Sequence, residues 1–166
     1  PHQWNKMVED HPEILEGSTN KYQNWEVTDP ERWVPEGYVV IRVDSRGAGW
    51  SPGIMDPDSE RETRDIHQCI EWAGTQQWSN GKVGMMGISW GGFNALQVAM
   101  RQPEALKAII TVCASDDRYN DDVHYMQGCL LHDNFAWSSA MYAFVSQPPD
   151  PAIVGDKWRE MWLARI

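Results

Sequence analysis

The amino-acid sequence predicts an α/β fold, a parallel sheet with flanking helices, from two observations. Apolar runs typical of buried strands occupy residues 38–43, 83–88 and 106–113. Stretches with helical periodicity lie between these runs. Connections of this length join strands in parallel, and right-handed crossovers bring their carboxyl ends to one edge of the sheet. We therefore expect Asp44–Arg46, Ser89 and Asp116–Asp117 to line that edge, where ligands of open α/β sheets bind.

Two helices are predicted between these strands. A capping box, Ser59-x-x-Glu62, marks the start of the first helix. Its apolar residues recur at helical spacing, at Ile66, Cys69, Ile70 and Ala73. The second helix is expected over residues 90–101, closed by Pro103.

The sequence between the second strand and the second helix is Gly87-Ile88-Ser89-Trp90-Gly91. The G-x-S-x-G pattern is short and occurs by chance in many glycine-rich loops, but here a strand precedes it and a helix follows it. In that context it is typical of a nucleophile elbow, whose sharp turn lifts the serine out of the strand end. We expect Gly87 and Gly91 to let the helix pass close to the strand. Ser89 is the predicted nucleophile.

A serine hydroxyl needs a base, normally a histidine oriented by a carboxylate, and donors for the oxyanion. The backbone N–H of Trp90 is the first predicted donor, because it opens a helix at the elbow. The second donor should come from a loop before Tyr38.

Few histidines can serve as the base. In this architecture the acid and the histidine follow the serine, which removes His2, His11 and His67 and leaves His124 and His132. Both follow the acidic residues 116–122 closely, with no strand to carry them to the active edge. We expect the acid and base to lie beyond Ile166, and an internal triad is the alternative.

Beyond Cys113 the pattern changes and no fourth core strand is evident. We expect residues 1–121 to form a partial core and residues 122–166 to begin a helical cap, or lid, over the active edge. The last helix, over residues 157–165, is predicted to be amphipathic. A helix from Trp4 toward Glu16 is expected near the start of the chain.

The composition excludes several classes of function. The 166 residues carry a net charge of −10, which argues against nucleic acid as a partner. Cys69, Cys113 and Cys129 are widely spaced and odd in number, so we expect buried thiols rather than a metal site or disulfides. Pro52 interrupts the only stretch that resembles a dinucleotide loop, and no cofactor or metal is expected. No leader or membrane span is visible, which favours the cytoplasm.

Several motifs together resemble one family. They are Gln3–Asn5, Asn20–Trp25, Arg42–Gly49, Gly84–Gly92, Ser115–Tyr119 and Asp121–Tyr125. This combination is similar to acyl hydrolases of the cocaine esterase and X-Pro dipeptidyl-peptidase type. The resemblance implies an α/β-hydrolase core, a helical cap inserted after the third strand and a C-terminal jelly-roll domain.

The resemblance also implies roles for single residues. The family's nucleophile matches Ser89, and the next residue, here Trp90 where relatives often have Tyr, offers a backbone oxyanion donor. The family's second donor is a tyrosine hydroxyl upstream of Pro1, and its acid and histidine follow the cap. Asp122 resembles an acidic residue that holds a substrate ammonium in related α-amino ester hydrolases, with Asp121 as the alternative alignment. A solvated acidic loop is the other interpretation of this stretch.

The predicted function is that of a serine hydrolase, which cleaves an ester or amide bond through an acyl-enzyme on Ser89. Small-molecule esters, amides and short peptides are the expected substrates, with neither nucleic acid nor membrane as a partner. The alternative is a binding module with an α/β-hydrolase fold and no catalysis.

Overall fold

The computed structural model describes residues 13, 19, 21–22 and 26–165. They form two compact units, Asp56–Ser146 and a second unit that joins the described residues up to Met55 with those from Gln147 onward. The helix expected from Trp4 toward Glu16 falls, Glu13 apart, outside the described residues. The boundary expected between residues 121 and 122, and the assignment of the later residues to a cap, stay predictions.

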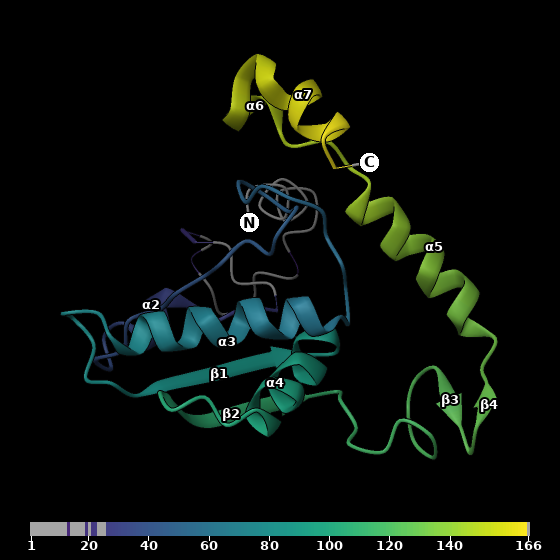
Figure 1. Cartoon of the computed structure of the whole chain (residues 1–166), viewed down its shortest axis with the longest axis horizontal. Coiled ribbons are helices and arrows are strands. Elements are labelled where there is room, and N and C mark those ends of the chain that lie inside the picture. Colours follow the sequence, from purple (N-terminus) through teal and green to yellow (C-terminus); the bar gives the residue numbers. More distant parts are fainter. Residues whose placement is uncertain (1–12, 14–18, 20, 23–25, 166) are drawn as a thin grey trace. The chain divides into compact units, whose positions relative to one another are not determined.

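A parallel two-stranded sheet organises the Asp56–Ser146 unit. Strand β1 (Val83–Ile88) pairs with β2 (Leu106–Val112), in a register that places Met85 opposite Ile109. Helix α4 (Trp90–Met100) connects the two strands and packs against both, while α3 (Glu60–Gly74) packs against α4 and β1 (Figure 1). The predicted parallel order of these strands and helices is confirmed.

The core of this unit lies between the helices and the sheet. Ile70 of α3, Val98 of α4 and Ala105 before β2 are buried together, with four half-buried apolar side chains packed around them: Ile66, Val83, Met85 and Leu106. Ser59 caps α3 as predicted, because its Oγ accepts a hydrogen bond from the backbone N–H of Glu62 at 3.1 Å. The carboxylate of Glu62 accepts in return from the N–H of Asp58 rather than from that of Ser59.

The strand predicted at Tyr38–Val43 is wrong in the structure. This segment belongs to no strand of the described chain, although its exposure alternates, with Val39 and Ile41 exposed and Val40 half-buried. The β-branched residues favour extended backbone, but a strand also requires a hydrogen-bonded neighbour. No described residue pairs with this segment in a ladder.

The purely helical character expected from about Asp122 onward is also partly wrong. A small antiparallel hairpin comes first, with strands β3 (Tyr125–Met126) and β4 (Cys129–Leu130), and helix α5 (Asp133–Val145) follows it. Its two-residue turn has positive φ at both positions, +50° at Gln127 and +78° at Gly128. Such turns match the twist of paired strands, so this pair favours a hairpin over a helix.

In its described residues, the second unit contains four short helical segments: α2 (Pro30–Trp33), α6 (Pro151–Val154), η2 (Gly155–Lys157) and α7 (Trp158–Leu163). α2 and α6 each begin with an aspartate cap followed by proline, a pairing that suits a helix start. The predicted amphipathic face of the last helix is confirmed, since Trp158, Met161 and Trp162 are half-buried while Arg159 and Glu160 are exposed. Within the described residues, no helix has the length and apolar character needed to cross a bilayer.

Candidate active site

Ser89 occupies the single residue between the end of β1 and the start of α4. Its backbone has φ +53° and ψ −118°, a conformation that non-glycine residues rarely adopt. The backbone is held on both sides: its N–H donates to the carbonyl of Val112 at 2.9 Å, and its carbonyl accepts from the N–H of Phe93 at 2.9 Å. The residue itself is exposed. This is the strand, sharp turn and helix that the sequence predicts around Ser89.

The elbow is crowded at a different pair of glycines from the predicted pair. A Cβ on Gly87 would lie 2.3 Å from the backbone of Gly91, so the predicted close approach is present at Gly87. A Cβ on Gly91 would meet no described atom within 4 Å, so the expectation that Gly91 itself lacks room for a side chain is wrong. The second crowded position is Gly92, whose Cβ would lie 2.8 Å from Ala114 and 2.9 Å from the carbonyl of Val112.

Trp90 is the first residue of α4, and the first backbone N–H groups of a helix have no partner within the helix. Its N–H therefore stands next to Ser89 as the candidate oxyanion donor. Its indole is also held in place, because Nε1 donates to the carboxylate of Glu62 at 3.1 Å. The second oxyanion donor is expected from a loop before Tyr38, and the resemblance implies a tyrosine upstream of Pro1. This donor stays a prediction.

The two candidate histidines differ in their surroundings. His124 is buried, its ring packs edge-on against Trp137 with 4.7 Å between centroids, and its Nδ1 has no partner in the described part of the chain. His132 is exposed. Neither imidazole hydrogen-bonds to Ser89 among the described residues, and His2 and His11 lie outside them. The location of the base and acid therefore stays a prediction.

Asp122 is not part of a solvated loop, in contrast to its exposed neighbour Asp121. The Asp122 side chain is 0% exposed, and its Oδ2 accepts from Nε of Arg118 at 2.7 Å. Its Oδ1 accepts from the backbone N–H of His124 at 3.1 Å. Both carboxylate oxygens are thus engaged, and the predicted ammonium-binding role stays a prediction.

Opposing effects set the pKa of Asp122. Burial raises the pKa, but the hydrogen bonds from Arg118 and His124, with the positive charge of Arg118, outweigh burial and hold the pKa below its ordinary value of 3.8. Asp122 is therefore a carboxylate at neutral pH, and any substrate group it bound would meet a negative charge.

Arg118 is a residue of this region that the sequence analysis did not single out. Its guanidinium lies over the Phe93 ring, with 4.3 Å between the guanidinium carbon and the ring centroid. Phe93 is in the first turn of α4, one turn after Ser89. Arg118 therefore connects the Asp122 carboxylate to helix α4, which begins directly after Ser89. The only signal for this pair in the sequence is an opposite charge four residues away, which is common on protein surfaces.

The cysteines are more exposed to solvent than predicted. Cys113 and Cys129 are exposed and Cys69 is half-buried, so the expectation of three buried thiols is wrong. Their positions explain the difference: Cys113 directly follows β2, and Cys129 belongs to the small hairpin rather than to a core element. Among the residues that the structure describes, no group of three His, Cys, Asp or Glu side chains is arranged to hold a metal ion.

Comparison with known proteins places this elbow in a family. The model of the X-Pro dipeptidyl-peptidase (S15) family matches residues 6–165. A cocaine esterase from Rhodococcus sp. is 35% identical over 128 residues, which is 72% of this chain and 22% of the esterase. The crystal structure of a CocE/NonD family hydrolase from Staphylococcus aureus is 36% identical with a TM-score of 0.65, over 73% of this chain and 22% of that one.

The chain therefore spans about a fifth of the length of these relatives. The similarity to the solved hydrolase confirms the predicted α/β-hydrolase core, of which β1, α4 and β2 are a part. The family match covers both described units and the elbow around Ser89. The chain belongs to the X-Pro dipeptidyl-peptidase (S15) family of hydrolases.

Proposed function

We propose that this chain supplies the nucleophile of a serine hydrolase that cleaves ester or amide bonds through an acyl-enzyme on Ser89. The observation that carries the proposal is the conformation of Ser89, an exposed residue at φ +53° between a parallel strand and a helix start. Backbone strain of this kind costs about 1–3 kcal/mol and persists where the surrounding structure enforces it. Here two backbone hydrogen bonds and the tight contact of Gly87 with Gly91 enforce it.

The proposed reaction follows from this geometry. Ser89 Oγ attacks the carbonyl carbon of the substrate while its proton passes to a base, and the carbonyl oxygen becomes an oxyanion facing the N–H of Trp90. Collapse of this intermediate breaks the bond to the alcohol or amine, which leaves with the proton. Water then attacks the acyl-enzyme, and its proton passes through the same base to Ser89 as the acid product leaves.

The base and its orienting acid are proposed to lie outside residues 1–166. Three facts support this: the chain covers only about a fifth of the relatives' length, no described histidine hydrogen-bonds to Ser89, and His124 is buried against Trp137. Substrates of the relatives named above offer two classes, esters and peptides beginning X-Pro, and both contain an acyl carbon that Ser89 could attack.

The experiment that tests this function is the Ser89→Ala variant of the full-length enzyme, assayed with p-nitrophenyl butyrate and with an X-Pro p-nitroanilide. Loss of a triad nucleophile lowers turnover by about 10⁶, so both activities should fall to background. The matched control is Ser115→Ala, which removes the hydroxyl from another serine near the sheet edge and should retain turnover. A folded Ser89→Ala variant with turnover close to wild type would refute the proposal.

A further inference from the structure

A carboxylate from a neighbouring helix holds the first turn of α4. Glu62, in the first turn of α3, accepts the indole N–H of Trp90 at 3.1 Å and the backbone N–H of Asp58 at 2.9 Å, both on Oε2. The side chain of Asn94 also acts on the Glu62 carboxyl group, where it lowers the pKa slightly against the effect of burial. Because Trp90 and Asn94 are four residues apart, they lie on one face of α4. Glu62 therefore holds the start of α4 through the Trp90 indole, and Asn94 lies one turn further along the same face.

This carboxylate is retained against an electrostatic cost. Burial raises the pKa of Glu62 above its ordinary value of 4.5, although the hydrogen bonds from Trp90, Asp58 and Asn94 oppose the rise. A raised pKa means that the folded state disfavours the ionised form of Glu62. The free energy of unfolding therefore decreases as the pH rises from 4.5 through the folded pKa of Glu62.

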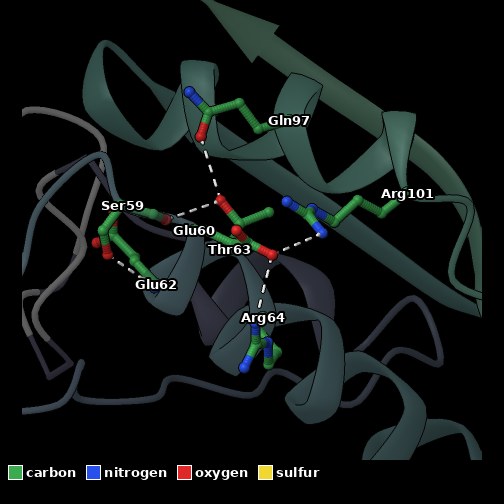
Figure 2. Close-up of polar contacts among 7 residues, drawn as sticks. All are labelled: Ser59, Glu60, Glu62, Thr63, Arg64, Gln97 and Arg101. Carbon is green, nitrogen blue, oxygen red and sulfur yellow. Dashed lines mark hydrogen bonds and ion pairs between the residues drawn. The ribbon is translucent and has the colours of Figure 1, made fainter.

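The other polar contacts between α3 and α4 lie away from the elbow. Figure 2 shows the hydroxyl of Thr63 directed at Gln97, with 3.3 Å between the oxygens, and Glu60 facing Arg101 just after the end of α4 at 3.7 Å. The first contact joins the same two helices, and the second joins α3 to the residue just after α4, so both lie further along the chain from Ser89 than Trp90. They are natural controls for any effect of helix docking in general.

We propose that Glu62 is a positioning residue for the oxyanion donor: it fixes the first turn of α4 so that the Trp90 N–H points to the substrate oxyanion. This inference rests on the proposed function of Ser89. An oxyanion donor acts at about 2.7–3.1 Å from the developing charge, and a misplacement of about 1 Å in an active site can lower the rate about 10²-fold. A hydrogen bond to the side chain of the same residue therefore controls how well its backbone N–H is aimed.

The test replaces the acceptor in the full-length enzyme. Glu62→Met should lower kcat for p-nitrophenyl butyrate by about 10–100-fold and leave KM nearly unchanged. The reason is that the hydrogen bond from the Trp90 backbone N–H to the substrate oxygen becomes strong only in the transition state. The inhibition constant of phenylboronic acid should rise by a similar factor, since its tetrahedral adduct on Ser89 uses the same donor. Glu62→Gln keeps a carbonyl oxygen for the indole and should recover most of the lost kcat.

Trp90→Phe removes the indole N–H but keeps the backbone N–H, so it tests the same contact from the other side. It should lower kcat in the same range, and the double variant Glu62→Met/Trp90→Phe should be no worse than the poorer single variant. This variant also carries the test if Glu62→Met does not fold. The controls Thr63→Val and Glu60→Gln should alter the melting temperature without a selective loss of kcat.

Two outcomes overturn the inference. Glu62→Met and Trp90→Phe could both keep wild-type kcat and boronate affinity, or Thr63→Val could lower kcat as much as they do, which would indicate general helix docking. Either result would contradict the role of Glu62 but not the proposed function of Ser89, as long as the Ser89→Ala variant is inactive. An active Ser89→Ala variant would instead remove the proposed function on which the inference rests.

Discussion

Ser89 combines an exposed hydroxyl with a backbone that only glycine adopts without strain. This allows a stability prediction separate from catalysis. Ser89→Gly and Ser89→Ala should both be inactive, but Ser89→Gly should unfold at a higher temperature. The difference should be about 0.5–1 kcal/mol, because alanine retains the Cβ that is strained at positive φ. Thermal unfolding of the two variants measures it, and an equal or lower melting temperature for Ser89→Gly would show that the turn is not strained.

At the same scale, Asp122→Asn separates two roles of one carboxylate. If Asp122 binds a substrate ammonium, the variant should raise KM for α-amino esters and leave KM for neutral esters unchanged, since a lost charge matters only to a charged partner. If it serves only the ion pair with Arg118, both substrate types should respond alike. Steady-state kinetics with matched esters of phenylalanine and of 3-phenylpropionate distinguishes the two, and equal changes would argue against the substrate-binding role.

The low pKa of Asp122 predicts a pH dependence of stability. Because the folded pKa lies below 3.8, the contribution of Asp122 is fully present above that value and is lost as the pH falls through the folded pKa. Hydrogen bonds to a charged group contribute about 1.5–3 kcal/mol, which is the expected destabilisation by Asp122→Asn at pH 7. Urea unfolding between pH 7 and pH 3 should show the gap between wild type and variant narrowing in acid. A gap that stays constant over this range would contradict the depressed pKa.

At the scale of elements, the elbow depends on two glycines and tolerates change at a third. Gly87→Ala and Gly92→Ala should each destabilise the fold by at least about 1–3 kcal/mol, because a new Cβ would meet atoms that include fixed backbone. Gly91→Ala is the matched control and should be neutral or slightly stabilising, since alanine suits a helix better than glycine. Chemical denaturation of the three variants tests this order. A Gly91→Ala variant as unstable as the other two would show that the space beside Gly91 is filled.

The elements also show which structural features local sequence can predict. Strand β1 and helix α4 were predictable because an apolar run, the G-x-S-x-G pattern and Pro103 agree over adjacent residues. Residues 38–43 have an equally clear local pattern, but a ladder depends on a partner that no local pattern reports. The crowding at Gly92 likewise comes from Val112 and Ala114, which only the paired strand brings near.

The candidate site was predictable to a similar extent. Ser89 and Trp90 follow from one motif, whereas the Trp90–Glu62 hydrogen bond joins residues 28 positions apart and appears only once α3 and α4 are packed. The burial of Asp122 was equally hidden, because in sequence it is one of several aspartates in an acidic stretch. Packing, which local sequence patterns do not report, decides which polar side chain is exposed to solvent and which is buried and hydrogen-bonded.

At the scale of the whole molecule, the proposal requires catalytic partners from outside this chain. Purified residues 1–166 should not hydrolyse p-nitrophenyl esters above background, because an unassisted serine stays protonated. The full-length protein should hydrolyse these esters and should be labelled at Ser89 by a fluorophosphonate. Circular dichroism of the short chain serves as the control for folding. Activity of the short chain that disappears in His124→Ala or His132→Ala would establish the internal triad instead.

The identity of the nucleophile is the central claim, and covalent labelling tests it most directly. The full-length enzyme is treated with a fluorophosphonate, digested and examined by mass spectrometry for the residue that carries the phosphonyl group. The account predicts one modified peptide that contains Gly87–Gly91, with the adduct on Ser89 and complete loss of esterase activity at one equivalent. An inactivated enzyme with its adduct on another residue and Ser89 unmodified would contradict it.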